Sequence, residues 1–164
     1  LAVCHIVYAF ILTAQNRSAR GSERYAVTAK PEKVEWASQN MLVLGLIVVL
    51  GIGLHLFNFW YKMMFAELAG MQTALAPSDG FGLIKATFSN PVYVVLYIIW
   101  LVAIWFHLSH GFWSAMQTIG INGKVWFNRW KAIGIVYVTV LMLAFVAVVL
   151  AFYFGIAPSL CAAA

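Results

Sequence analysis

Four stretches of this chain contain no Asp, Glu, Lys or Arg, and they constrain its fold more than any other feature. They cover residues 1–16, 36–61, 86–123 and 132–164. A helix needs about 20 apolar residues to cross the hydrocarbon core of a bilayer, so each of the last three can span a membrane. The chain is 64% hydrophobic and 9% charged, whereas soluble domains are about 25% charged. The sequence therefore predicts an all-α membrane protein, built as a transmembrane helical bundle.

Turn residues divide this bundle into four predicted spans within a single membrane-anchor domain, residues 1–164. Gly21 follows the first span, Pro91 opens the third, and Gly120 closes it, as is typical of helix ends. The first span is too short to cross a bilayer alone, and the chain begins at Leu1 rather than Met. We therefore expect it to be the second half of a helix, with a further helix before it. The predicted spans cover residues 1–15, 34–65, 91–118 and 126–154.

The basic residues predict the orientation of the spans. Of the ten Lys and Arg residues, five lie within residues 17–33 and three within 124–131, against only Lys62 and Lys85 around the connection of residues 66–90. Cytoplasmic connections carry an excess of Lys and Arg. The first and last connections are thus predicted to be cytoplasmic, in a multi-pass protein of the cell inner (cytoplasmic) membrane. This placement also argues against a nucleic-acid partner, despite the net charge of +5.

Three of the four histidines lie on separate predicted spans. His5 and His55 are 50 residues apart, and His55 and His107 are 52 residues apart. An ionisable side chain inside a bilayer is costly, so a functional role is the default interpretation. Helical bundles hold haem iron between histidines of different helices. We therefore interpret His5, His55 and His107 as candidate iron ligands, although a single histidine could instead form a hydrogen bond between helices.

Depth in the membrane divides these histidines into two groups. His5 lies ten residues before Gln15, roughly 15 Å from the predicted cytoplasmic edge. His107 lies 11 residues before Thr118, roughly 16 Å from the same edge. His55 lies roughly 22 Å from that edge. We expect His5 and His107 to bind one haem, and His55 to bind a second haem whose other ligand lies on the expected upstream helix.

Small residues lie one helical turn from each candidate ligand. Ala9 follows His5 by four residues, Gly51 precedes His55 by four, and Gly111 follows His107 by four. Residues four apart share a helix face, so each small residue could leave room for a flat porphyrin. The alternative is that small residues simply allow membrane helices to pack closely.

Two further groups are secondary candidates. His110 lies three residues after His107, and a hydrogen bond to a propionate, a quinone or a neighbouring helix is favoured over iron ligation. Arg17 and Arg20 could form charge-assisted bonds to haem propionates. Alternatively, both arginines serve as topology signals and contact a soluble partner.

The segments that carry these residues are His5–Tyr8 with Gln15–Gly21, Gly53–Leu56, and Phe106–Ser114 continuing to Ile121. Together they resemble the two-haem cytochrome b membrane anchors of succinate dehydrogenase and fumarate reductase. The likeness extends over nearly all 164 residues and is most specific at Phe106–Ser114.

This resemblance implies five helices that hold two haems b. The second and fourth helices hold the haem nearer the cytoplasm, and the first and third hold the distal haem. By this likeness His5 and His107 are proximal ligands and His55 is a distal ligand. The position that matches His110 is not always histidine in the family. Trp105 stands where some members have an acidic residue, so that proton path is not supported here.

The resemblance also implies partners and a role. A flavoprotein subunit would interconvert succinate and fumarate, and an iron–sulfur subunit on the cytoplasmic side would pass electrons to the proximal haem. The anchor would bind both haems and exchange electrons with menaquinone or ubiquinone in the membrane, without performing the carbon chemistry itself.

Two alternatives remain open at this stage. The chain could be another quinone-linked haem b subunit, such as a quinol oxidase anchor or a hydrogenase cytochrome. It could also be a haem-free transporter or channel with histidine proton relays. A transporter predicts broken helices at mid-membrane. The predicted helices are continuous except near Gly51 and Gly53, and no span contains paired Asp or Glu residues.

Overall fold

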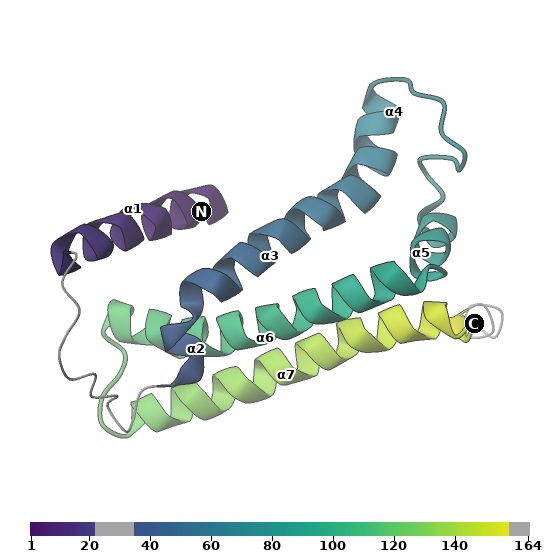
Figure 1. The fold of residues 1–164 in the computed structure, drawn as a ribbon. Helices are drawn as coiled ribbons and strands as arrows, with labels where there is room; N and C mark the ends of the chain where they lie inside the picture. Colours follow the sequence, from purple (N-terminus) through teal and green to yellow (C-terminus); the bar gives the residue numbers. More distant parts are fainter. Residues whose placement is uncertain (22–34, 158–164) are drawn as a thin grey trace. The chain divides into compact units, whose positions relative to one another are not determined.

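The computed structural model describes residues 1–21 and 35–157, and every regular element within those ranges is helical (Figure 1). The chain divides into two compact units, residues 1–43 and 44–164. The predicted all-α class is confirmed for the described residues.

The first unit contains helix α1 (Ala2–Arg20) and the short helix α2 (Trp36–Gln39). Gly21 ends α1 with a φ of 67°, a left-handed conformation that glycine adopts at little cost. This agrees with the predicted helix end. Arg17 and Arg20 lie in the last turn of α1, where positive charge interacts favourably with the helix dipole.

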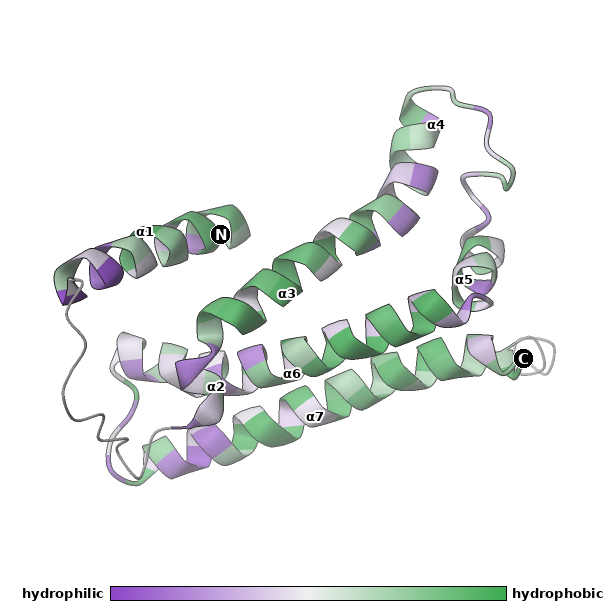
Figure 2. Ribbon diagram, viewed as in Figure 1, coloured by the Kyte–Doolittle hydropathy of each residue, from purple (hydrophilic) through white to green (hydrophobic). Residues whose placement is uncertain are grey.

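Three helices are long and apolar enough to cross a membrane. They are Met41–Leu68, Pro91–Ile119 and Trp126–Tyr153, and Figure 2 shows that hydrophobic residues predominate along them. This finding indicates a multi-pass membrane protein and agrees with three of the four predicted spans. Residues 1–15 form most of α1, which is not among these three helices. The predicted span of residues 1–15 is therefore not confirmed.

The first of these long helices consists of three consecutive parts, α3 (Met41–His55), η1 (Leu56–Phe65) and α4 (Ala66–Leu68). It begins seven residues later than predicted, because the chain first forms α2 and then leaves helical geometry at Asn40. The side-chain amide of Asn40 donates to the Trp36 carbonyl oxygen at 2.9 Å. This local hydrogen bond competes with continuation of the helix.

The connection after α4 leads into helix α5 (Gly80–Phe88) and then α6 (Pro91–Ile119). Asp79 caps α5 by accepting a hydrogen bond from the Gly82 amide at 2.8 Å. Asn90 caps α6 by accepting from the Val92 amide at 2.9 Å, with Pro91 in the first turn. These caps satisfy amide groups that a helix start leaves without partners.

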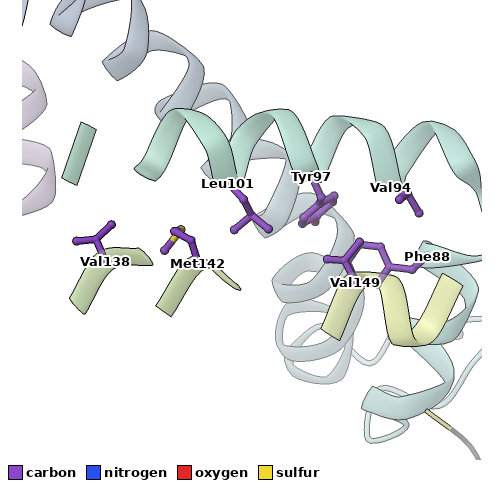
Figure 3. Packing of buried hydrophobic residues seen from close by; sticks show 7 residues of the cluster. All are labelled: Phe88, Val94, Tyr97, Leu101, Val138, Met142 and Val149. Carbon is purple, nitrogen blue, oxygen red and sulfur yellow. The ribbon is translucent and has the colours of Figure 1, made fainter. Parts of the chain in front are cut away.

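Helix α6 packs along α7 (Trp126–Tyr153), and these two helices provide most of the core (Figure 1). The Trp105 indole donates to the Thr139 hydroxyl at 2.8 Å. A Cβ added at Gly134 would lie 2.6 Å from Phe112, so only glycine permits this close approach. Figure 3 shows the buried cluster, which comprises Phe88, Val94, Tyr97, Leu101, Val138, Met142 and Val149.

Candidate functional site

The helical geometry changes immediately after His55. Residues Leu56–Phe65 form a π-helix, although the sequence pattern predicts continuous α-helix here. Along this segment the rings of Phe57, Tyr61 and Phe65 stack on one another, with centroids 5.7 and 5.3 Å apart. Short π-helical segments inside α-helices occur frequently at functional sites. The π-helix therefore indicates a candidate ligand site around His55.

Aromatic rings surround one side of His55. The centroid of its imidazole lies 4.9 Å from that of Phe59, 5.7 Å from that of Trp100 and 6.1 Å from that of Tyr97. Phe59 comes from η1, whereas Trp100 and Tyr97 come from α6. The imidazole is nevertheless exposed rather than enclosed. It is thus positioned by packing while remaining accessible to another group.

A cavity of about 490 Å³ adjoins this histidine. Its volume falls within the range of roughly 300–1,000 Å³ that is typical of small-molecule sites. The walls come from α3, η1, α5, α6 and α7 and are almost entirely aromatic or aliphatic. They include His55, Phe59, Phe88, Tyr97, Trp100 and Met142. Such a cavity suits a large apolar ligand with one atom that can bind a nitrogen of the His55 imidazole.

A buried polar pair lies beside the cavity, and the sequence interpretation missed it. Asn58 is 0% exposed, and its Nδ2 atom donates to the Tyr97 hydroxyl at 3.4 Å. The Asn58 Oδ1 atom has no hydrogen-bond partner among the described residues. Buried polar groups without partners are uncommon and costly. The only sequence signal was an Asn three residues after a candidate ligand, which did not indicate which neighbour it would contact.

This pair supports a first prediction. Replacing Asn58 with Leu removes the unpaired amide but leaves the Tyr97 hydroxyl without its partner, so we expect destabilisation by about 1 kcal/mol. The double variant Asn58→Leu/Tyr97→Phe removes both polar groups and should be about as stable as the unaltered protein. Unfolding of the purified variants in mixed detergent micelles measures the difference. If Asn58→Leu is more stable than the double variant, the hydrogen bond between Asn58 and Tyr97 does not contribute to stability.

His107 lies on α6, at a different height along the packed helices α3 and α6 from His55. A Cβ added at Gly45 would lie 3.6 Å from the His107 Cε1 atom, so the imidazole packs against the glycine on α3. Gly45 precedes His55 by ten residues, which corresponds to roughly 15 Å along a helix. His55 and His107 are thus too far apart along the helices to bind the same iron. The depths predicted from the sequence also separate these two histidines, but by only roughly 6 Å.

The space beside Gly51 differs from the expectation. The indole of Trp100 occupies the position where a side chain at Gly51 would begin, since an added Cβ would lie 1.9 Å from the Trp100 Cδ1 atom. The Trp100 indole N–H also donates to the Val48 carbonyl oxygen at 3.0 Å. Gly51 therefore accommodates a tryptophan of α6 rather than presenting an open patch beside His55.

The predicted patch at Gly111 is open. An added Cβ there would meet nothing within 4 Å among the described residues. His110, one residue earlier, packs edge-on against Trp113 with ring centroids 4.7 Å apart. His107 and His110 therefore have different surroundings, although they lie on the same helix.

The remaining candidates, His5 and Arg17, belong to α1 in the first unit, where both are exposed. The pairing of His5 with His107 stays a prediction. Within residues 1–21 and 35–157, no group of three or more His, Cys, Asp or Glu side chains could hold a metal ion. A haem iron needs only two axial protein ligands, so this finding concerns other kinds of metal site.

Comparison with known proteins gives no family assignment. No protein-family model, no curated protein and no solved structure matches the chain. The resemblance to cytochrome b anchors therefore depends on short sequence motifs alone.

Proposed function

We propose that this chain is the haem b-binding membrane anchor of a succinate dehydrogenase or fumarate reductase complex. In this role it carries electrons between an iron–sulfur subunit and the membrane quinone pool. The observation that supports this most strongly is His55, an exposed imidazole at the wall of a cavity of about 490 Å³ inside an apolar helical unit. His107, at a separate level of the same helices, supports a two-haem arrangement.

The residues around His55 fit one side of a haem. The imidazole would serve as one axial ligand, and the apolar walls would exclude water from the ring. Phe59, Tyr97 and Trp100 hold the imidazole by packing, which restricts its orientation. Bound haem supplies reversible one-electron transfer, and the axial ligands and the low polarity of the walls tune its potential. No other histidine lies at this level within the described part of the second unit, so the second axial ligand is proposed to come from another helix.

The proximal haem is proposed to bind between His107 and His5. Gly45 makes room for the His107 imidazole on one side, and Gly111 leaves an open face one turn away. Arg17 and Arg20 are proposed to pair with the propionates through charge-assisted hydrogen bonds. His110 is proposed to donate a hydrogen bond at the edge of this site rather than to bind the iron.

The orientation predicted from the basic residues places the proximal site toward the cytoplasm. The flavoprotein and iron–sulfur subunits would therefore bind on that side, and menaquinone or ubiquinone would exchange electrons within the inner membrane. A related quinone-linked haem b subunit would differ in the spacing of its ligands and in its soluble partners.

One observation favours a second candidate, a haem-free transporter with histidine proton relays. The π-helix η1 interrupts an apolar helix directly after His55, and transporters use non-α-helical segments at membrane depth. This candidate requires no haem, so spectroscopy distinguishes the two.

The test is a reduced-minus-oxidised absorption spectrum of the purified complex. We expect the α and Soret bands of b-type haem, because two bis-histidine sites are proposed. The variant His55→Ala/His107→Ala, purified in the same way, should lose these bands while retaining its helical circular dichroism. A well-folded complex without any b-type band would exclude the haem proposal and leave the transporter.

A further inference from the structure

Cations and aromatic rings gather where α6 ends and α7 begins. We call this the basic–aromatic end, and it comprises Trp113, Lys124, Trp126, Phe127, Arg129, Trp130 and Lys131. The Lys131 amine lies 4.8 Å from the ring centroid of Trp113 and 5.2 Å from that of Phe127. The Arg129 guanidinium lies 5.2 Å from the ring centroid of Trp126. Cation–π contacts of this kind restrict the basic side chains.

The basic–aromatic end contains no negative charge of its own. Residues 80–164 include no Asp or Glu, whereas Lys124, Arg129 and Lys131 lie within eight residues. Lys124 and Arg129 are also exposed. Lys124 and Arg129 carry like charges five residues apart, which repel one another unless an anion lies near them, and neither α6 nor α7 contains Asp or Glu.

The surroundings of these cations are apolar and exposed. Ile119 is 68% exposed, Val125 62% and Trp126 48%. The Trp130 indole N–H donates to the Ile121 carbonyl oxygen at 2.8 Å, which fixes the connection against α7. Because this connection joins two candidate spans, it lies at a membrane surface. Exposed apolar side chains beside cations match a molecule that has both an anionic group and hydrocarbon chains.

We propose that the basic–aromatic end binds an anionic phospholipid of the adjoining leaflet, with its phosphate between Lys124 and Arg129. Basic pockets between membrane helices bind anionic headgroups in this way, and Trp side chains favour the same depth. A free phosphate would leave the apolar side chains uncovered. The positive charges of Lys124 and Arg129 would repel a partner protein whose own surface is basic. This inference does not depend on haem binding.

The test uses the full chain reconstituted in nanodiscs of phosphatidylcholine and phosphatidylglycerol in equal parts, with retained lipids counted by native mass spectrometry. We expect phosphatidylglycerol to be retained in preference to phosphatidylcholine. The variant Lys124→Gln/Arg129→Gln should bind it about 30-fold more weakly, since each interfacial cation contributes roughly fivefold. The charge-conserving variant Lys124→Arg/Arg129→Lys should retain most of the preference and serves as a second measurement if the first variant folds poorly.

The matched control is Lys62→Gln/Lys85→Gln, which removes two cations elsewhere in the same unit. Lys62 also lies 5.7 Å from an aromatic centroid, that of Phe57, so the control removes a comparable cation–π contact. We expect it to leave phosphatidylglycerol binding unchanged. Equal losses in both double variants would show that net charge alone attracts the lipid, and would overturn the proposal. Unchanged lipid binding in Lys124→Gln/Arg129→Gln, with loss of a soluble subunit, would assign this end to a protein partner instead.

Discussion

Replacing His107 with Ala should remove one of two haems and about half of the b-type absorbance of the purified complex. The proposed reason is loss of an axial ligand on one side of the proximal iron, since haem potentials and affinity depend on both axial groups. His55 lies at another level of the helices, roughly 15 Å away along α3. The haem proposed at His55 should therefore remain. A pyridine haemochrome assay against protein concentration gives the haem count directly.

The matched comparison is His110→Ala, one helical turn away on the same helix. His110 packs against Trp113, and we expect this variant to retain both haems with at most a shift in the reduction potential of one. If His107→Ala retains both haems and His110→Ala loses one, the ligand role belongs to His110. Loss of all haem in His107→Ala, with helical content preserved, would contradict the independence of the two sites.

The variant Gly51→Ala should destabilise the second unit by about 1–3 kcal/mol, as is usual for overpacking of a filled space. The added methyl group would overlap the Trp100 indole, which begins 1.9 Å from the ideal Cβ position. Displacing the indole also breaks its hydrogen bond to the Val48 carbonyl oxygen. Thermal unfolding in detergent measures the loss, and the cavity beside His55 should change shape because Trp100 lines it.

Gly53→Ala provides the control, two residues further along the same helix. An added Cβ at Gly53 meets nothing within 4 Å among the described residues. Alanine is favoured over glycine inside a helix by about 1 kcal/mol, so this variant should be neutral or slightly stabilising. Equal destabilisation by the two variants would mean that helix flexibility, rather than the Trp100 contact, determines the result at Gly51.

The three long apolar helices were predictable because their signals are local. Uncharged length predicts where a helix can cross a bilayer, and Asn90, Pro91 and Gly120 mark both ends of α6 within one residue. The start of α3 was less predictable, because the hydrogen bond from Asn40 to Trp36 interrupts an otherwise apolar run.

The contacts of the candidate site depend on how each helix is rotated, and a single sequence does not specify rotation. Three glycines lie on one helix among similar neighbours in the sequence, yet their surroundings in the structure differ. Gly45 packs on His107, Gly51 accommodates Trp100 and Gly53 is open. The π-helix after His55 and the contact between Asn58 and Tyr97 depend in the same way on tertiary packing. The helix that carries each histidine was therefore predictable, whereas the immediate neighbours of each histidine were not.

The uninterrupted α6 helix sets how far apart Trp100 and His107 lie, and each of these residues adjoins one of the two proposed haem sites. Trp100, beside the His55 cavity, and His107 are seven residues apart on this 29-residue helix. Their axial separation, roughly 10 Å, is thus set by backbone hydrogen bonds rather than by a loop. Inserting one residue between Trp100 and His107 would shift one of them by about 1.5 Å along the helix axis and rotate it by about 100° around that axis. Electron tunnelling declines steeply with distance, so the transfer rate should tolerate changes in the surface connections far better than any change in the length of α6.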